Sequence, residues 1–404
     1  MRVEFEGEMR EKPVKQVTSY SKYFKLVGGA FAAAMLTFGV AACGGSDDSD
    51  KWRIGLEAPL SGDLQTLGEG MLNGAELAAN QINAGGGLEG KDVEIVPIDD
   101  GGDLEIGVSA AKDAIDGGLD GVVGPYNSGV GIETLPLYED AGLVPIRLTS
   151  DNDTAGFGFT LQPMVSQIAP VTSDALASWI GASTVAIAYD PTENYTDEVS
   201  RAVKSELESN GVEVTAFEQV EPGQDDYSDL VDKLAAGKPD ASYYAVYFPE
   251  GALIAKATAS GDSDPTCLLD YASYDTGYVE DAGNADAGKC DVVGVPAPDD
   301  FEGSTAYVSD YRDQFGEASG TWSPYTYDSV NLLAYGVEQS GGFDADALTA
   351  ALNEVSGWEG WTGSVTLEPG SGNRDPATVT VDEVSDQGIF RVDRAWAQAV
   401  GAPY

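Results

Sequence analysis

The chain has 404 residues, of which 68 are acidic and 21 basic, so its formal net charge is -47. A negative excess of this size repels phosphate backbones and anionic lipid headgroups, which disfavours nucleic-acid binding and direct membrane binding. Histidine is absent, which removes the commonest general base and the commonest neutral metal ligand.

The first 50 residues have the pattern of an export signal and a linker. An apolar run from Leu26 to Gly39 follows two lysines, but it is short and rich in Gly and Ala for a bilayer span. It leads into Val40-Ala41-Ala42-Cys43, which resembles the bacterial lipobox and implies cleavage before Cys43 and lipid on its thiol. An uncleaved membrane helix with an incidental cysteine is the alternative. We therefore expect a lipoprotein signal peptide at 1–42 and a flexible acidic tether at 43–50.

Without the signal the chain is still more acidic. Residues 1–42 hold 6 basic and 4 acidic residues, so 15 basic and 64 acidic residues remain, a net charge of -49. Salt screens the repulsion among such charges, so we hypothesise a salt-adapted protein whose melting temperature rises with added salt. The remaining length suits two packed domains rather than one.

The chain has three cysteines, one of which is assigned to the lipid. The other two, Cys267 and Cys290, form an even pair in an oxidising compartment, where a disulfide is expected. Two buried thiols are the alternative, because the sequence does not fix the distance between them.

Strand-like and helix-like patterns alternate from residue 53 to residue 146. For example, Leu72, Ala75, Ala79 and Ile82 have helical spacing, and a run of three glycines from Gly85 ends that helix. The predicted strands are 53–60, 93–98, 121–124 and 143–146, and the predicted helices are 72–84, 104–115 and 128–140.

A second alternating set begins at Ser183. Its predicted strands are 183–189, 212–217, 242–248, 267–270 and 292–295, and its helices are 197–210, 227–236 and 250–259. Helices at 305–315, 329–339 and 345–355 and strands at 378–381 and 388–392 follow. Such alternation predicts an α/β fold with two Rossmann-like lobes, each with a parallel central sheet covered on both faces.

In open parallel sheets, ligands bind beyond the carboxyl ends of the strands. Two such lobes facing each other would enclose a cleft there. The loops expected at this cleft are 59–68, 125–131, 147–156, 190–196, 247–251 and 270–274.

Two of these loops have the chemistry of an anion site. Ser128 lies at a strand-to-helix junction, where free backbone N–H groups and a hydroxyl can hold a carboxylate. Its alternative role is to cap its own helix. The loop from Arg147 to Asp153 adds hydroxyls and carboxylates at the next strand end, although a solvated turn has the same composition.

The loops of the second lobe are rich in tyrosine, which offers an apolar wall and a polar tip to a small amphiphilic ligand. Some of these tyrosines would instead belong to the core. Asp270 ends a strand and would suit a ligand ammonium, although an exposed aspartate beside a turn is the commoner case. The tyrosines are Tyr195, Tyr247, Tyr271, Tyr274, Tyr325 and Tyr327.

Enzymatic and metal signatures are weak. Ser109-Ala-Ala-Lys112 fits S-x-x-K, but it lies within a predicted helix without companion motifs. Asp151, Asp153 and Gly156 occupy calcium-loop positions one, three and six, but Ala155 and Gln162 stand where oxygen ligands are required. We expect no cofactor, no metal and no catalytic residue.

Several segments share one further pattern. They are Ile54 to Gly62, Asn73 to Ala78, Ile82-Asn83 with the glycines to Gly90, Asp99-Asp100, Leu137 to Gly142, Tyr243-Tyr244, Phe248 to Glu250 and Thr326 to Val330. Together they resemble the leucine/isoleucine/valine-type periplasmic binding proteins. The resemblance implies a type I fold with a three-segment hinge, whose closed form is presented to an ABC importer. It implies lobe 1 at 51–165 plus 299–365 and lobe 2 at 166–298 plus 366–404.

The resemblance also implies a ligand site, position by position. Ser128 matches the serine that holds the amino-acid carboxylate, and Leu67 matches a position that packs on the ligand. Asp151 stands where the family often has threonine, and Asp270 or Tyr271 stands where it uses glutamate for the ammonium. We infer that the Asp151 carboxylate needs a partner such as Arg147. The predicted ligand-binding residues are Leu67, Tyr126, Ser128, Thr149, Ser150, Asp151, Tyr195, Tyr247, Asp270 and Tyr271.

These observations predict an extracytoplasmic solute-binding protein of an ABC importer, with an amino acid or a similar small polar molecule as its ligand. Its expected partners are the ligand, the ABC permease subunits and the outer face of the cytoplasmic membrane, the last through the lipid anchor alone. No nucleic acid is expected. A ligand-sensing module for a signalling partner is the alternative.

Overall fold

The computed structural model describes residues 51–261, 265–298, 300–301 and 304–402. The predicted signal peptide, the tether and the lipidation site at Cys43 lie outside these residues. Among the helices of the described part, none has the length and apolar character needed to cross a bilayer.

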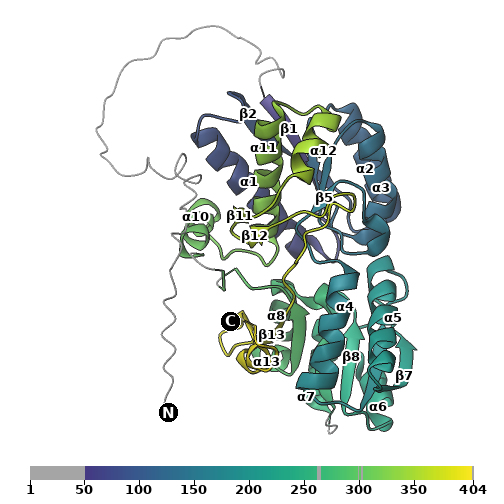
Figure 1. Cartoon of the computed structure of the whole chain (residues 1–404). Helices are drawn as coiled ribbons and strands as arrows, with labels where there is room; N and C mark the ends of the chain where they lie inside the picture. Colours follow the sequence, from purple (N-terminus) through teal and green to yellow (C-terminus); the bar gives the residue numbers. More distant parts are fainter. Residues whose placement is uncertain (1–50, 262–264, 299, 302–303, 403–404) are drawn as a thin grey trace, which may run out of the picture. The chain divides into compact units, whose positions relative to one another are not determined.

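The first sheet has five parallel strands in the order β2-β1-β3-β4-β5. Helices α1 and α11 pack together on one face, while α2 and α3 cover the other (Figure 1). The strands are β1 (Lys51–Ala58), β2 (Asp92–Asp99), β3 (Gly121–Val123), β4 (Pro145–Arg147) and β5 (Phe159–Thr160), and the helices are α1 (Gln65–Ala84), α2 (Leu104–Asp116), α3 (Ser128–Asp140), α11 (Ser323–Ser340) and α12 (Ala345–Asn353), with α10 (Thr305–Phe315) beside α1.

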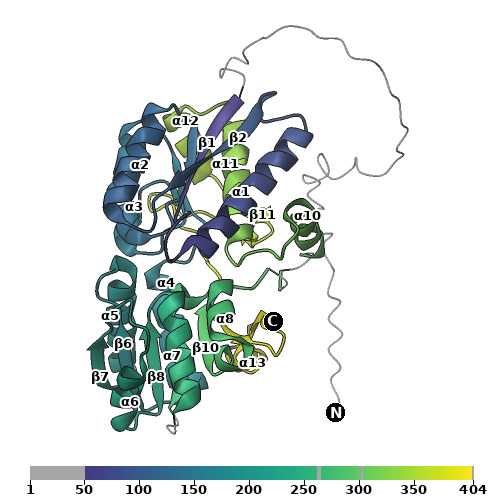
Figure 2. The same ribbon diagram turned by 180° about the vertical axis from the view of Figure 1, so that it is seen from behind.

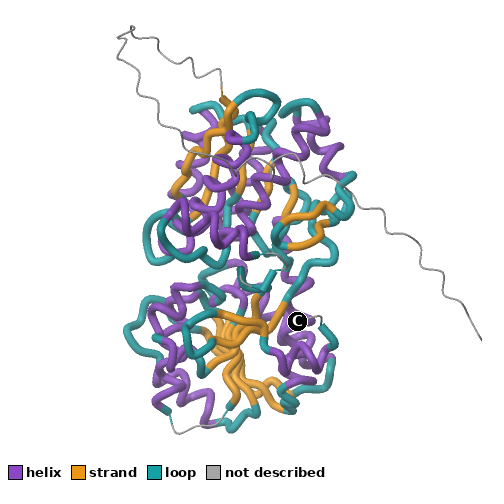
Figure 3. Tube along the Cα trace, turned by 90° about the vertical axis from the view of Figure 1, so that its left-hand side faces the viewer, coloured by secondary structure: helices purple, strands orange, loops and turns teal. Residues whose placement is uncertain are grey.

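The second sheet has seven strands in the order β14-β13-β10-β9-β8-β6-β7. Strands β6 to β10 pair in parallel, whereas β13 pairs antiparallel with both β10 and β14 at one edge of the sheet. Helices lie on both sides of these strands in Figure 3, with α4 and α5 facing the viewer in Figure 1 and α7 in Figure 2. The strands are β6 (Thr184–Tyr189), β7 (Glu213–Gln219), β8 (Ala241–Ala245), β9 (Thr266–Leu269), β10 (Cys290–Gly294), β13 (Thr380–Val384) and β14 (Phe390–Val392), and the helices are α4 (Val165–Asp174), α5 (Asn194–Ser209), α6 (Ser228–Ala236), α7 (Phe248–Ser260), α8 (Thr276–Ala282), α9 (Asn284–Ala287) and α13 (Arg394–Val400).

The predicted two-sheet α/β fold is confirmed. The two terminal strands were predicted without a pairing direction, and in the structure β14 returns beside β13 after a short turn at Gly388, where the backbone φ is +74°. A short turn joins antiparallel neighbours, because a parallel connection needs a crossover of a dozen or more residues.

Apolar residues of the sheets and of the covering helices pack together on both faces of each sheet. All five residues of β8 are buried, as expected for a central strand covered by helices on both sides. On α5, buried Tyr195, Val199, Val203 and Leu207 recur at helical spacing and face this sheet, while the opposite side carries charged residues.

The chain passes between the two sheets three times. It leaves the first sheet after β5, returns from β10 to α10, and leaves again before β13. Before this last passage, a hairpin of β11 (Trp358–Gly360) and β12 (Gly363–Val365) is followed by a bridge between Asn373 and Thr160 at the edge of the first sheet. The lobe limits proposed from the sequence remain a prediction.

Cys267 and Cys290 are joined by a disulfide. They are directly opposite each other on the parallel neighbours β9 and β10, with their Cα atoms 4.6 Å apart. The strand register therefore brings the two cysteines together, information that their spacing in the sequence does not carry.

Candidate functional site

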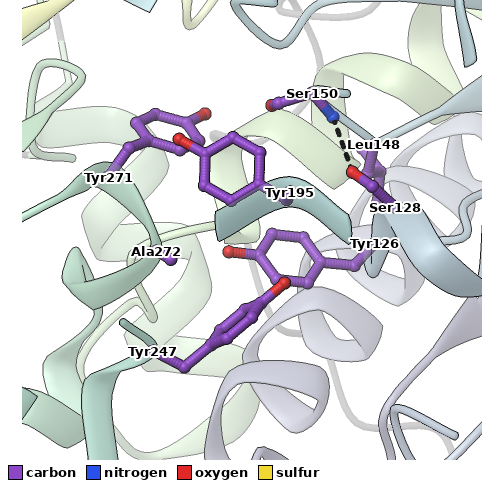
Figure 4. Close-up of a pocket in the computed structure, with 8 residues that line it drawn as sticks. All are labelled: Tyr126, Ser128, Leu148, Ser150, Tyr195, Tyr247, Tyr271 and Ala272. Atoms are coloured by element: carbon purple, nitrogen blue, oxygen red, sulfur yellow. Dashed lines mark hydrogen bonds between the residues drawn. The ribbon is translucent and has the colours of Figure 1, made fainter. Parts of the chain in front are cut away.

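A small cavity lies beyond the carboxyl ends of strands from both sheets. Tyr126 lies in the loop between β3 and α3, Ser128 is the first residue of α3, and Leu148 and Ser150 follow β4. Tyr195 lies on α5, Tyr247 follows β8, and Tyr271 and Ala272 follow β9. Figure 4 shows these side chains around the cavity. The lining residues are Tyr126, Ser128, Leu148, Ser150, Tyr195, Tyr247, Tyr271 and Ala272.

Ser128 forms a polar corner of this cavity. Its side chain does not cap α3, because the N-cap residue is Asn127. Instead, its Oγ accepts hydrogen bonds from the backbone N–H groups of Ser150, at 3.3 Å, and Asp151, at 3.2 Å. Because two backbone donors occupy the oxygen of this hydroxyl, its hydrogen is left to donate to a carboxylate, next to the positive end of a helix dipole.

Four tyrosines form a neutral wall opposite this corner. Tyr126, Tyr195, Tyr247 and Tyr271 are all buried. Burial raises the pKa of each phenol well above its ordinary value, so the hydroxyls stay protonated and the wall carries no charge.

Two of these tyrosines are fixed by polar contacts. The Tyr247 hydroxyl accepts a hydrogen bond from Nδ2 of Asn127 at 3.3 Å. The Tyr271 hydroxyl donates to Oε1 of Gln162, the residue that lies between β5 and α4. Both contacts join the part of the molecule built on the first sheet to the part built on the second sheet, which are its two halves.

A tryptophan supports the wall from behind. The Trp322 ring is 5.0 Å from the Tyr271 ring and 5.7 Å from the Tyr126 ring, and only 1% of the residue is exposed. Tilted aromatic pairs at these distances add attraction beyond the area that they bury, so the wall is part of a packed aromatic cluster.

Asp270 lies under the wall, outside the lining of the cavity. Its carboxylate is fully buried and accepts hydrogen bonds from the Tyr243 hydroxyl and, at 3.0 Å, from the Ala272 backbone N–H. Burial raises the pKa of this carboxyl, and the hydrogen bonds lower it. In this arrangement its oxygens are engaged by the protein, so the ammonium-binding role inferred for Asp270 remains a prediction.

Three other predicted residues are also outside the lining. Leu67 is buried in the core on α1. Thr149 shares a hydrogen bond of 2.7 Å with the hydroxyl of Thr154. Asp151 caps a one-turn 3-10 helix, Asn152–Thr154, by accepting from the Asp153 backbone N–H at 2.7 Å.

The suggested pairing of Arg147 with Asp151 is wrong. The buried guanidinium donates to the backbone carbonyls of Phe157, at 2.9 Å, Gly158, at 3.0 Å, and Ser371, at 3.2 Å, and also to the side chain of Asn373. Burial lowers the pKa of Arg147 to about 9. The Arg147 side chain therefore connects the first sheet to the segment around Ser371 and Asn373, which leads from the first sheet to β13.

Six of the ten predicted ligand-binding residues thus line one cavity: Tyr126, Ser128, Ser150, Tyr195, Tyr247 and Tyr271. Leu148 and Ala272 also line the cavity, although neither was among the predicted residues. Both lie within loops that were predicted to border the cleft, next to predicted residues. Their positions in the sequence therefore indicated a place near the ligand, whereas their small or apolar side chains did not.

Comparison with known proteins identifies a family and several relatives that this chain resembles. Residues 51–386 match the family described as periplasmic binding protein. The Leu/Ile/Val-binding protein homolog 2 of Brucella abortus is 26% identical over 338 residues, which are 81% of this chain and 89% of that protein.

Two solved structures share the fold. The branched-chain amino acid transporter substrate-binding protein LivJ of Streptococcus pneumoniae, in complex with isoleucine, has a TM-score of 0.77 at 20% identity, covering 85% of this chain and 99% of that one. A solute-binding protein of an ABC transporter from Rhodopseudomonas palustris, in complex with 3,4-dihydroxybenzoic acid, has a TM-score of 0.75 at 18% identity, covering 85% and 96%.

Proposed function

The chain belongs to the periplasmic binding protein family, and from this premise we propose that it captures an amino acid or a similar small polar molecule for an ABC importer. We further propose that it acts outside the cytoplasmic membrane, held there by lipid on Cys43. The relatives are named as binding proteins, and family membership confirms the expectation that the chain is not an enzyme.

The observation that carries this proposal is the position of the cavity. Its lining comes from loops at the carboxyl ends of strands in both sheets, so one ligand would contact both halves of the chain at once. Ligand contacts on both halves convert binding energy into closure of the halves around the ligand.

The side chains that line the cavity indicate which chemical groups a ligand should carry. A carboxylate fits beside Ser128 and the N–H groups that converge on its hydroxyl. An apolar or aromatic part fits the four tyrosine rings. The two solved relatives hold isoleucine and 3,4-dihydroxybenzoic acid, so both amino acids and aromatic acids belong in a test panel.

A thermal-shift screen over amino acids, amides and small carboxylates tests the proposal, because a ligand that binds only the folded protein raises its melting temperature. We expect at least one compound of the panel to raise it, with calorimetry confirming a single site. A panel with no binder at millimolar concentration would contradict the proposed ligand class.

Replacing Ser128 by alanine is expected to weaken ligand binding about tenfold, which is the value of one lost hydrogen bond to a charged group. Isothermal titration calorimetry measures the affinity and circular dichroism checks the fold. The matched control is Ser200→Ala, which removes another buried hydroxyl, one that donates to the Asp197 carbonyl at 2.9 Å on α5. Equal affinities of Ser128→Ala and the unchanged protein would remove Ser128 from the site.

Lipid anchoring has its own test. After expression in a lipoprotein-processing bacterium, we expect the chain to begin at Cys43, to carry the mass of added acyl chains and to remain with the membrane fraction. In Cys43→Ala the acyl chains cannot be attached, so we expect the protein to leave the membrane fraction. Each acyl chain contributes about 0.8 kcal/mol of membrane affinity per buried methylene, and nothing else in the proposed anchor replaces it. Intact-mass spectrometry showing an unmodified Cys43 in the mature chain would refute the anchor.

A further inference from the structure

One contact outside the cavity joins the half of the molecule built on the first sheet to the half built on the second sheet through two hydrogen bonds. Asn152 lies in the turn after β4, and Glu198 lies on α5. The backbone N–H of Asn152 donates to one Glu198 carboxylate oxygen at 3.0 Å, and the Asn152 side-chain Nδ2 donates to the other oxygen at 2.7 Å. Both oxygens of one carboxyl group thus accept from Asn152, a geometry that fixes orientation as well as distance. The Asp151 carboxyl is also hydrogen-bonded to Glu198, and burial raises the pKa of Glu198 to about 7.

Each partner is next to a residue that lines the cavity. Asn152 follows Ser150 by two positions, and the intervening Asp151 donates its N–H to Ser128. Glu198 follows Tyr195 by three positions on α5, about one turn of helix. The contact therefore holds together the same two elements that a ligand in the cavity would touch.

The turn is also held from its other side. The Asn152 Oδ1 accepts a hydrogen bond from the backbone N–H of Ser166 on α4 at 3.3 Å. The Asn152 side chain thus links the turn to both α4 and α5. We infer that the Glu198 contact also fixes the position of the Ser150 and Asp151 N–H groups that donate to Ser128.

We propose that Asn152 and Glu198 form a clamp that holds the two halves of the chain together and so sets ligand affinity without touching the ligand. The affinity part of this inference rests on the proposed function. Because ligand and clamp stabilise the same arrangement of α5 and the turn, each strengthens the other by the same free energy.

Hydrogen exchange of the ligand-free protein tests the clamp by itself. In Glu198→Ala the Asn152 N–H loses its acceptor, so we expect its exchange to become about tenfold faster, with faster exchange also at Ser150 and Asp151. Glu206→Ala, which removes one carboxylate from the same helix eight residues further on, is the matched control and should leave these amides unchanged. Unchanged exchange at Asn152 in Glu198→Ala would overturn the clamp.

A double-mutant cycle measures its effect on binding, with L-isoleucine and 3,4-dihydroxybenzoic acid as probes. Asn152→Ala and Glu198→Ala should each raise the dissociation constant about tenfold, mainly through faster dissociation, and the double variant should be no worse than either. Glu198→Gln, which keeps one acceptor oxygen, should be intermediate. Additive losses would show two independent structural defects and refute the coupling.

The exchange measurement and the binding cycle distinguish failure of the clamp from failure of the proposed function. If the unchanged protein binds neither probe, the proposed ligand class is wrong, while the exchange measurement still decides the clamp. If a probe binds and the four affinities are equal, the clamp has no role in affinity, and the proposed solute-binding function stands.

Discussion

The protein is expected to be more stable at pH 5.5 than at pH 8, with a free energy of unfolding higher by at least about 2 kcal/mol. The reason is a set of buried carboxyl groups without a cationic partner strong enough to keep them ionised. Burial raises the pKa of Asp100 and Asp275 from 3.8 to about 7, and that of Asp328 to about 6.

The direction follows from where protons bind. Between about pH 4 and pH 7 the folded chain holds protons on these carboxyls that the unfolded chain has released, so acidification favours the folded state and rising pH removes this stabilisation. One group whose pKa is raised from 3.8 to about 7 contributes roughly 2 kcal/mol between pH 8 and pH 5.5. The chain has no histidine, so the side chain that usually titrates in this range does not contribute.

Urea unfolding at both pH values in 1 M NaCl measures the effect, because salt at this concentration screens the general repulsion of the acidic surface. Asp275→Asn should raise stability at pH 8 and reduce the pH dependence, since asparagine can still accept the helix-capping hydrogen bond that the Gly277 N–H makes to Asp275 at 2.9 Å. Asp344→Asn, an exposed cap of α12, is the matched control. Stability that is equal or lower at pH 5.5 would contradict the prediction.

Loss of the disulfide between Cys267 and Cys290 is expected to lower the free energy of unfolding by about 3 kcal/mol. The bond closes a loop with a sequence separation of 23, and cross-linking a loop of this length restricts the unfolded chain by about that amount. Ligand affinity should change little, because Cys267 is near the start of β9 while the cavity residues Tyr271 and Ala272 follow its carboxyl end.

Reduction of the unchanged protein and the double variant Cys267→Ala, Cys290→Ala provide two routes to the same loss. The two should agree to within the small cost of the missing sulfur atoms. An unchanged urea midpoint after reduction, with free thiols verified by titration of the denatured protein, would show that the cross-link does not stabilise the fold.

The sequence was sufficient to predict most of the sheet strands and their helices, because their patterns are long and regular. Both α3 and α10 have the predicted limits, and the α1 helix ends where the glycine run predicts. Elements that escaped prediction lack such a pattern. Helix α4 contains Pro170 within its interior, and β5 has two residues, so its pairing with β4 depends on tertiary contacts rather than on local preference.

The candidate site was predictable in its location but less so in its detail. The rule that ligands bind at the carboxyl ends of parallel strands selects the loops that line the cavity. It does not say which way a side chain points within a loop. Asp151 was predicted from the family resemblance and Asp270 from its charge at a strand end, yet both carboxylates accept hydrogen bonds from neighbouring backbone N–H groups. Such local bonds are typical of aspartate in turns, and only coordinates distinguish them from contacts to a ligand.

The aromatic cluster behind the cavity also has an optical consequence. Trp322 is in ring contact with Tyr126 and Tyr271, so it is placed to receive excitation energy from both residues and to respond when either one moves. Its indole is shielded from water, and a guest molecule that shifts the tyrosines would alter its emission. Trp322, one of six tryptophans in the chain, is therefore expected to report occupancy through its own fluorescence, without an attached dye.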